Sequence, residues 1–222
     1  MLQRVDGVAD GLALEAEALI ANEAATCLWT ARRRAIVCPE NLRRKPGFDA
    51  ALRNAAARGW PVHLRPTGGG AVPQGPGVLN LALAFTASQR FTIEDGYRLI
   101  TGIIREAVSE DLRAGATPNS FCDGAWNLSY LGQKIVGTAQ RLRPIGGGRR
   151  RVLAHALILV EGDVAAGAAA IDAFHTDLTL PPIVAEAHTT LAEALGPDVP
   201  GADDLAEALE RAAGRALCEV TS

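Results

Sequence analysis

The first candidate for chemistry is a glycine-rich segment that runs from Arg65 into an apolar stretch, RPTGGGAVPQGPGVLNLALAF. Glycine has no Cβ, so Gly68, Gly69 and Gly70 can bring successive backbone N–H groups close to a ligand and form an anion-binding concavity. Arg65 stands beside them with a guanidinium fork that suits a phosphate or a carboxylate. We therefore predict an anion-binding loop, and the alternative is a plain tight turn between two strands.

The second candidate is a lysine in a chain that otherwise uses arginine. Of the 22 basic residues, only Lys45 and Lys134 are lysines. A compact ammonium makes contacts that a guanidinium cannot make. Lys134, within GQKIVGTAQR, is therefore predicted to be catalytic, and the alternative is a solvated lysine beside a hairpin turn. Strand alternation places Thr138 and Gln140 on the same face as Lys134.

The remaining polar residues give weaker signals. The four cysteines are scattered along the chain: Cys27, Cys38, Cys122 and Cys218. With no C-x-x-C pair, this spacing argues against a disulfide framework and against a zinc site, so we predict free thiols. No cluster of Asp and Glu marks a metal cage, and no metal site is predicted. His63, His175 and His188 show no spacing that suggests a role.

Composition and charge exclude several classes of function. The chain has 222 residues and a net charge of −3, so nothing global indicates a nucleic-acid or membrane-surface partner. No apolar run approaches the roughly 20 residues of a transmembrane helix. Acidic residues interrupt the apolar part of the N-terminus, which is not typical of a secretory signal. We predict a cytoplasmic protein.

The hydrophobic pattern predicts strands in the middle of the chain and helices around them. The predicted helices cover residues 10–21, 48–59, 93–112, 162–174 and 202–220. The predicted strands cover residues 26–38 as a pair or one long strand, 61–66, 78–85 and 152–160, with a hairpin turning at 131–133. Residues 141–151 are predicted to form a mobile loop. In the first helix, Leu12, Ala16, Leu19 and Ile20 form the predicted apolar face, with Glu15 off it.

These elements favour an α/β (α+β) fold, a mixed, largely antiparallel β-sheet flanked by α-helices. We predict a single domain over residues 1–222. The alternative is a boundary near Pro181 and Pro182 that sets off a small helical C-terminal segment.

Three motifs in order resemble a known superfamily. They look like the signatures of the lipoate-protein ligase branch of the biotin ligase, lipoate ligase and octanoyltransferase superfamily. The motifs are R-x-T-G-G-G-A-V before a buried strand, GQKIVGTAQR and VLAHALILVEGD. DGLALEAEALI fits the family's first helix, and the match spans residues 10–165. The resemblance implies a catalytic domain of the biotin/lipoate ligase type. A biotin ligase itself is disfavoured because its R-G-R-x-G-R-type loop is absent.

The resemblance implies an enzyme that joins lipoate or octanoate to one lysine of a carrier domain. A ligase of this family uses ATP, most simply with Mg²⁺, to form an acyl-adenylate, and Lys134 then contacts the acyl carbonyl and the phosphate. The implied substrate- and nucleotide-binding residues lie in the three motifs: Arg65, Thr67, Gly68, Gly69, Gly70, Ala71, Val72, Asn80, Gly137, Thr138, Ala139, Gln140 and His155. His155 either lines an acyl tunnel and helps to deprotonate the incoming lysine, or is a core histidine bonded to backbone.

The sequence departs from the ligase pattern after the glycines. Common lipoate ligases carry a His-Asp pair where this chain has Pro73, Gln74 and Gly75. One transferase branch has a cysteine nucleophile just before the lysine-bearing strand, and here FCDG places Cys122 close to that position. The alternatives to a ligase are therefore an octanoyltransferase that uses a Cys122 thioester, and a non-catalytic lipoate- or octanoate-binding homologue.

The implied partner is a lipoyl domain of a 2-oxoacid dehydrogenase or a glycine-cleavage H-type protein. A transferase would also meet an acyl carrier protein. The chain has 62 residues after Val160, too few for the large accessory domain of long ligases, so a ligase could need a separate accessory subunit. The predicted loop is bordered by Arg141, Arg143 and Arg149–Arg151. These arginines form either a solvated face, a contact to a triphosphate or a docking patch for the carrier domain.

Overall fold

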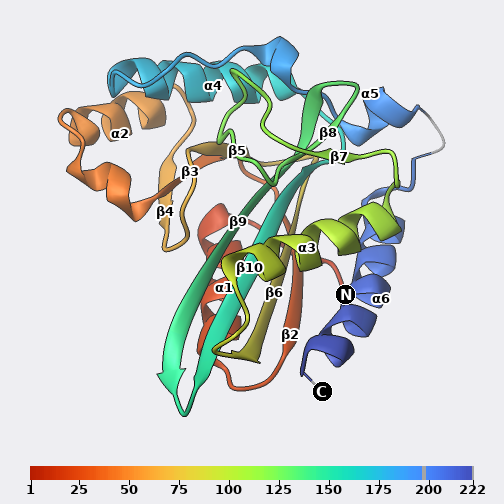
Figure 1. The fold of residues 1–222 in the computed structure, drawn as a ribbon. Helices are drawn as coiled ribbons and strands as arrows, with labels where there is room; N and C mark the ends of the chain where they lie inside the picture. Colours follow the sequence, from red (N-terminus) through yellow and green to blue (C-terminus); the bar gives the residue numbers. More distant parts are fainter. Residues whose placement is uncertain (197–198, 222) are drawn as a thin grey trace.

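A computed structural model describes residues 1–196 and 199–221 of the chain, and its centre is a seven-stranded sheet (Figure 1). In spatial order the strands are β1 (Gln3–Val5), β2 (Ala25–Ala31), β6 (Val78–Ser88), β10 (Arg149–Leu159), β9 (Gln133–Gly146), β8 (Leu128–Tyr130) and β7 (Arg113–Ala114). All neighbours in it pair antiparallel except β1 and β2. The predicted fold class is confirmed.

A second, three-stranded sheet carries the glycine-rich loop. It consists of β4 (Val62–Arg65), β3 (Ala35–Pro39) and β5 (Val72–Gln74), in that order. The loop therefore leaves the end of β4 and returns as β5, with β3 between them. The segment predicted as a strand pair or one strand is divided at residues 32–34 between β2 in the large sheet and β3 in the small one.

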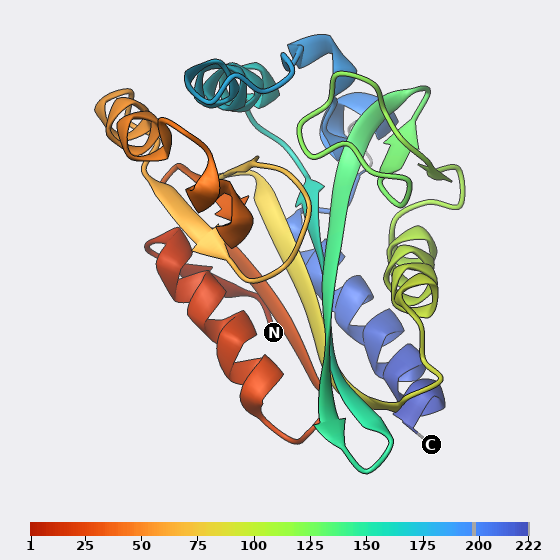
Figure 2. The ribbon, with the colours of Figure 1, turned by 60° about the vertical axis from the view of Figure 1, so that its left-hand side comes forward.

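Helices cover both faces of the large sheet. They are α1 (Val8–Ile20), α2 (Phe48–Ala57), α3 (Ile93–Ala107), α4 (Val164–Asp177), α5 (Leu191–Leu195) and α6 (Ala202–Thr221), with 3-10 turns at Glu40–Arg44 and Ala185–Ala187. Figure 2 shows α3 and α6 on one side of the long strands, and α1 with the small sheet on the other. No helix of the described residues is long and apolar enough to cross a bilayer.

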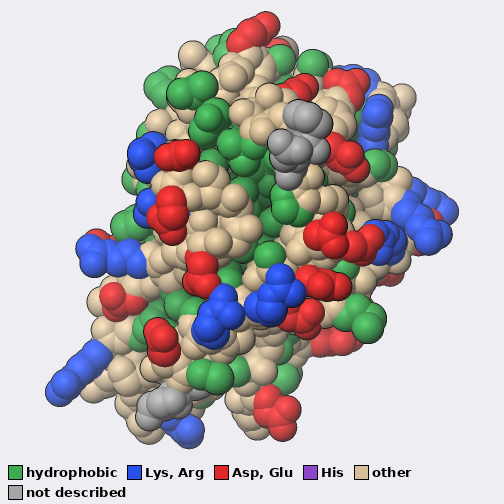
Figure 3. Space-filling model, turned by 90° about the vertical axis from the view of Figure 1, so that its right-hand side faces the viewer, with side chains coloured by type: hydrophobic (Ala, Val, Ile, Leu, Met, Phe, Trp, Pro, Cys, Tyr) green, Lys and Arg blue, Asp and Glu red, His purple; other side chains and the backbone are tan. Residues whose placement is uncertain are grey.

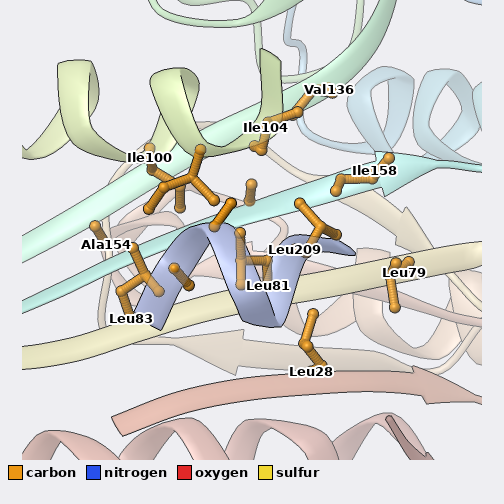
Figure 4. Packing of buried hydrophobic residues seen from close by; sticks show 14 of the residues in the cluster. Leu28, Leu79, Leu81, Leu83, Ile100, Ile104, Val136, Ala154, Ile158 and Leu209 are labelled. Carbon is orange, nitrogen blue, oxygen red and sulfur yellow. The ribbon is translucent and has the colours of Figure 1, made fainter. Parts of the chain in front are cut away.

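Strand β6 is buried on both faces, as its unbroken apolar run predicts. Leu79, Leu81 and Leu83 belong to the cluster formed with α3 and α6 (Figure 4). Ala82 and Ala84, which alternate with them, pack with Ala18 and Leu19 of α1. Helix α6, which follows the predicted boundary near Pro181–Pro182, packs into the same cluster as β6 and α3.

The apolar face of the first helix was predicted wrongly. Ile20 is 71% exposed, whereas Glu15 is only 4% exposed and faces the sheet. The small residue Gly11 lies on the buried side, against the ring of Trp29. The misreading has a physical reason: α1 approaches the sheet through small residues, and its buried carboxylate has polar partners that no hydropathy pattern reveals.

Two other element predictions need correction. The helix predicted over residues 93–112 ends at Ala107, and Thr92 caps its start by accepting a hydrogen bond from the Asp95 amide. Residues 141–151, predicted as a mobile loop, form the far end of the β9–β10 hairpin. Arg151 is buried there because its guanidinium donates to carbonyl oxygens near the C-terminal end of α1, including that of Ala18.

The face over α6 and the end of α3 carries basic and acidic side chains side by side (Figure 3). Arg4 pairs with Asp203 at 2.7 Å, and Arg215 of α6 pairs with Glu106 of α3. Exposed pairs of this kind contribute little to stability. This surface therefore has no strong charge of one sign.

Candidate functional site

A cavity lies between the large sheet, α1 and the glycine-rich loop. It contains about 420 Å³ of unfilled space, part of it open to solvent. Eight of the predicted site residues line it: Arg65, Val72, Asn80, Cys122, Gly137, Thr138, Ala139 and His155. Seven further residues complete the wall: Leu12, Glu15, Trp29, Val37, Gln74, Ala156 and Leu157. Most of this second set is apolar, which suits an aliphatic group.

Arg65 supports the glycine loop from within. Its guanidinium donates to the carbonyl oxygens of Gly68 (2.9 Å), Gly70 (2.8 Å) and Val37 (3.1 Å). The side chain that the sequence offered as an anion ligand is therefore engaged with three carbonyls, and its role in this structure is to fix the loop on β3.

Cys122 lies against the glycine loop. The backbone N–H of Gly70 donates to its Sγ at 3.0 Å. A Cβ on Gly69 would lie 2.7 Å from that sulfur, so this contact requires a glycine there. A Cβ on Gly70 would lie 3.1 Å from Cys122 Cα, a tight contact. Cys122 itself has φ +51°, a left-handed conformation that is uncommon outside glycine and typical of functional sites.

Side chains around Cys122 hold its backbone in this conformation. Asn127 donates from Nδ2 to the Cys122 carbonyl at 2.8 Å and accepts at Oδ1 from the Thr138 amide at 3.1 Å. Asp123 accepts from the Thr117 amide at 2.7 Å. These contacts bind the loop to β9, so the thiol is presented by a fixed backbone.

Lys134 lies directly behind Cys122 and is 0% exposed. Its Nζ donates to the carbonyl oxygens of Phe121 (2.5 Å) and Cys122 (3.0 Å), and lies 5.1 Å from the centre of the Phe121 ring. Burial lowers the pKa of Lys134 from 10.5 to about 8. The ammonium does not line the cavity in this structure, and it reaches the site only through the backbone of the cysteine loop.

A bulge in β9 changes which side chains accompany Lys134. Ser129 pairs with Lys134 and Leu128 with Val136, so Ile135 is an extra residue and the alternation of faces shifts there. The lysine side chain consequently runs beside Gly137, where a Cβ would lie 3.4 Å from Nζ. The prediction that Gln140 shares this face is wrong, since its amide donates to the Ile93 carbonyl at the start of α3.

His188 completes the support of the cysteine loop, a role that no spacing in the sequence indicates. Its Nε2 accepts from the Phe121 amide at 3.0 Å, and its ring stacks on that of Phe121 at 4.0 Å. Burial, and next the charge of Lys134, lower the pKa of His188 to about 4. The ring is therefore neutral at physiological pH, which its acceptor role requires.

A chain of four polar side chains joins α1 and β2 to β10 and the glycine loop. Glu15 accepts from Trp29 Nε1 at 3.0 Å through Oε1, and its Oε2 lies 3.0 Å from His155 Nδ1. His155 Nε2 lies 2.9 Å from Thr67 Oγ1. The carboxylate favours the proton on Nδ1, so Nε2 accepts from the threonine hydroxyl. His155 is thus an oriented proton acceptor and is not bonded to backbone.

The other predicted residues lie around this centre. Ala71 is buried beside Val72 at the start of β5. Asn80 exchanges hydrogen bonds with Gln74. Thr67 and Gly68 also border an open basin outside the loop, together with Arg43, Arg44 and Arg141. Among the residues that the structure describes, no three His, Cys, Asp or Glu side chains are grouped to hold a metal ion.

Comparison with known proteins identifies a family for the chain. The model of the lipoyl protein ligase A/B catalytic domain matches residues 21–213. An uncharacterized protein of Cupriavidus necator is 38% identical over 149 residues, which are 60% of this chain and 58% of that protein. An octanoyl-GcvH:protein N-octanoyltransferase of Kyrpidia tusciae is 36% identical over 142 residues, 60% of this chain and 49% of that enzyme.

The matches thus span about half to three-fifths of the length of these two relatives. Among solved structures, a lipoate-protein ligase A bound with ATP superposes with a TM-score of 0.71 at 19% identity, covering 98% of this chain and 84% of that one. At this identity the likeness concerns the fold.

Proposed function

Because the chain belongs to the lipoyl protein ligase A/B catalytic domain family, we propose that it is an acyltransferase that moves an octanoyl or lipoyl group through a thioester on Cys122. The family and fold resemblance is confirmed by this match. The choice of a transferase over the adenylate-forming ligase is our proposal. A single observation carries it: the sulfur of Cys122 lies in the cavity wall and accepts a hydrogen bond from the Gly70 amide at 3.0 Å.

The chemistry needs no nucleotide. In the first half-reaction, the sulfur attacks the carbonyl carbon of the donor's acyl group and the new C–S bond forms. The donor's acyl C–N or C–S bond breaks, and the thiol proton leaves with the departing amine or thiol. In the second half-reaction, the acceptor lysine's amine attacks the thioester carbonyl, the amide bond forms, the C–S bond to Cys122 breaks, and one amine proton returns to the sulfur. Protons and electrons balance over the two steps.

The contacts of Cys122 support this use. A backbone N–H that donates to a sulfur, and a lysine ammonium behind the same residue, both favour negative charge at the reacting centre. The left-handed backbone of Cys122 is held by Asn127 and Lys134, which keeps the thiol aimed into the cavity. A bystander thiol would need none of these contacts.

His155 supplies the proton acceptor for the second half-reaction. Glu15 fixes its tautomer, and Nε2 is bonded only to the hydroxyl of Thr67. An acceptor amine that enters the cavity can pass a proton to Nε2, directly or through that hydroxyl. The donor we propose is an octanoylated H-type protein, because the similar Kyrpidia enzyme is named for such a donor. The acceptor we propose is the lysine of a lipoyl domain.

The test is mass spectrometry of the protein after incubation with an octanoyl-H-protein and no ATP. We expect one octanoyl adduct on Cys122 that hydroxylamine releases, and no adduct in a Cys122→Ala variant. A Cys218→Ser variant is the matched control, since Cys218 lies on α6, outside the cavity lining. Octanoyl transfer at the wild-type rate by Cys122→Ala would exclude the thioester route.

The ATP-dependent ligase remains a second candidate because of the basin outside the glycine loop. Arg43, Arg44 and Arg141 line it beside Thr67 and Gly68, and such a group of guanidinium ions suits a polyphosphate. Pyrophosphate exchange into ATP that depends on octanoate or lipoate, with Mg²⁺ present, would favour this candidate. Tight binding of either acid with neither exchange nor transfer would indicate a non-catalytic binding protein.

A further inference from the structure

A pair of buried amides divides the cavity of Cys122 from a second cavity. Gln74 Nε2 donates to Asn80 Oδ1 at 2.6 Å, and Asn80 Nδ2 donates back to Gln74 Oε1 at 3.0 Å. The two residues are 5% and 4% exposed. Both line the first cavity, and Gln74 also lines the second, which contains about 620 Å³ of unfilled space, part of it open to solvent.

The strand register shows that the two cavities follow one another along the same face of the sheet. Leu157 of β10 pairs with Asn80 of β6, and both border the first cavity. Leu159 pairs with Val78, one side-chain step farther, and both border the second. Such a step is about 6.6 Å along a strand. The amide pair is therefore the partition between two consecutive spaces.

The chemistry of the second cavity changes along its depth. Near the partition its wall is formed by the buried apolar side chains of Val78, Leu159 and Phe121. Farther out, it is bordered by exposed charged residues, Arg34, Glu161 and Asp163. The part next to Gln74 would accept an aliphatic chain, and the outer part would not.

Buried amides are costly unless they are paired, so this pair must meet its own hydrogen-bonding needs. The reciprocal bonds do this and hold both side chains in one position. Asn80 also donates toward the carbonyl of Trp29 at 3.4 Å, which ties the partition to β2. An apolar side chain of the same size could move aside for a ligand more readily than two amides that would lose their partners.

We propose that the Gln74–Asn80 pair is the stop that sets the length of the acyl chain, with the second cavity as a closed-off extension of the acyl site. This inference rests on the proposed function, since it assumes that an acyl group occupies the first cavity. A chain that fills the first cavity ends against the amides. A longer chain would have to enter the space bordered by Val78 and Leu159, and the amide pair blocks that path.

The experiment compares Gln74→Ala with Gln74→Met by calorimetric titration with hexanoate, octanoate, decanoate and dodecanoate. Alanine opens the partition, whereas methionine retains most of the glutamine volume. In the wild type we expect affinity to be highest at eight carbons. In Gln74→Met, which keeps the volume but loses the amide bonds, we expect a smaller shift towards decanoate than in Gln74→Ala. In Gln74→Ala the decanoate-to-octanoate affinity ratio should rise by about fifteenfold, because decanoate places two more methylenes in an apolar space and each gains about fourfold.

A second variant tests the same path from the other side. Val164 lines the second cavity at the start of α4. Adding Val164→Trp to Gln74→Ala should fill the extension and return the preference to octanoate. Asn54→Ala, which removes an amide on the distant helix α2, serves as the control, and thermal unfolding identifies the variants that are folded.

An unchanged chain-length preference in a folded Gln74→Ala protein would overturn the proposal. So would a Gln74→Met protein that accepts decanoate more readily than Gln74→Ala, because the preference would then not follow the space opened at position 74. Fatty-acid binding is measured without an acyl donor, so it is independent of the Cys122 thioester. If Gln74→Ala shifts the chain-length preference but the protein forms no adduct on Cys122, the transferase proposal would fail and the Gln74–Asn80 stop would stand.

Discussion

Glu15 Oε2 lies 3.0 Å from His155 Nδ1 and joins the first helix to the strand at the centre of the sheet. The same carboxylate accepts from Trp29 through its other oxygen. One buried side chain therefore orients a proton acceptor and an aromatic wall of the cavity together. The arrangement explains why α1 buries a charge where its neighbours are apolar.

Replacing Glu15 with glutamine should slow acyl transfer while a side chain of the same size still fills the position. The amide has one oxygen in place of two, so either Trp29 or His155 loses its acceptor, at a cost to unfolding free energy of about 1–3 kcal/mol. We expect slower deacylation of a Cys122 thioester than in wild type, measured in single turnover. The control is Glu17→Gln on the exposed side of α1. An unchanged deacylation rate in Glu15→Gln would show that His155 does not take part in proton transfer.

The buried ammonium of Lys134 predicts a pH dependence of stability. Its pKa is about 8 in the folded chain, against an ordinary 10.5. Between these values the unfolded chain binds more protons, so the free energy of unfolding rises with pH in this window. Below about pH 8 the folded state carries the full cost of the buried charge. Chemical denaturation from pH 7 to 11 should show this rise in wild type and not in Lys134→Met.

The rate of acyl transfer should also depend on the protonation of Lys134, but it should fall with rising pH where stability rises. The ammonium that stabilises the reacting centre is lost as pH rises through about 8. We expect the rate of thioester formation by the wild type to fall above that pH. In Lys134→Met we expect a low rate at every pH, with no further fall above about pH 8. Equal rates for the two proteins at pH 7 would show that the charge of Lys134 does not act in the reaction.

His188 predicts a loss of stability in acid. Its pKa is about 4 in the folded chain and 6.5 ordinarily, so the unfolded chain binds more protons between these values. The free energy of unfolding should therefore fall as pH decreases from 6.5 to 4. His188→Gln, which keeps an acceptor for the Phe121 amide, should lack this component. Parallel stability curves for the two proteins over this range would contradict the assignment.

Two glycines on helices should respond to alanine in opposite directions. A Cβ on Gly11 would lie 2.3 Å from the Trp29 ring, so Gly11→Ala should destabilise the protein by about 1–3 kcal/mol. Gly102 is exposed on α3 with nothing within 4 Å of the added carbon, so Gly102→Ala should stabilise by about 0.5–1 kcal/mol. Thermal denaturation measures both, and a tolerated Gly11→Ala would disprove the close packing of α1 on β2.

Much of the fold was predictable because the signals are local. The apolar run of β6 indicated a strand buried on both faces, Thr92 and Asp95 marked the start of α3, and Leu131-Gly132 marked a hairpin that the structure builds with two left-handed residues. The end of α3 and the β9–β10 hairpin were missed, because both depend on partners elsewhere in the chain that local propensity does not include.

The sequence by itself determined the family, the glycine loop and the rarity of Lys134, since these follow from residue types in a fixed order. Only the tertiary structure decided how they meet. It brought Gly70 to Cys122 across 52 residues, buried Glu15 against His155, and turned Gln74 and Asn80 into a partition. The reason is physical: hydrogen bonds between distant segments, and a bulge that shifts a strand's alternation, depend on three-dimensional packing, which no single stretch of sequence records.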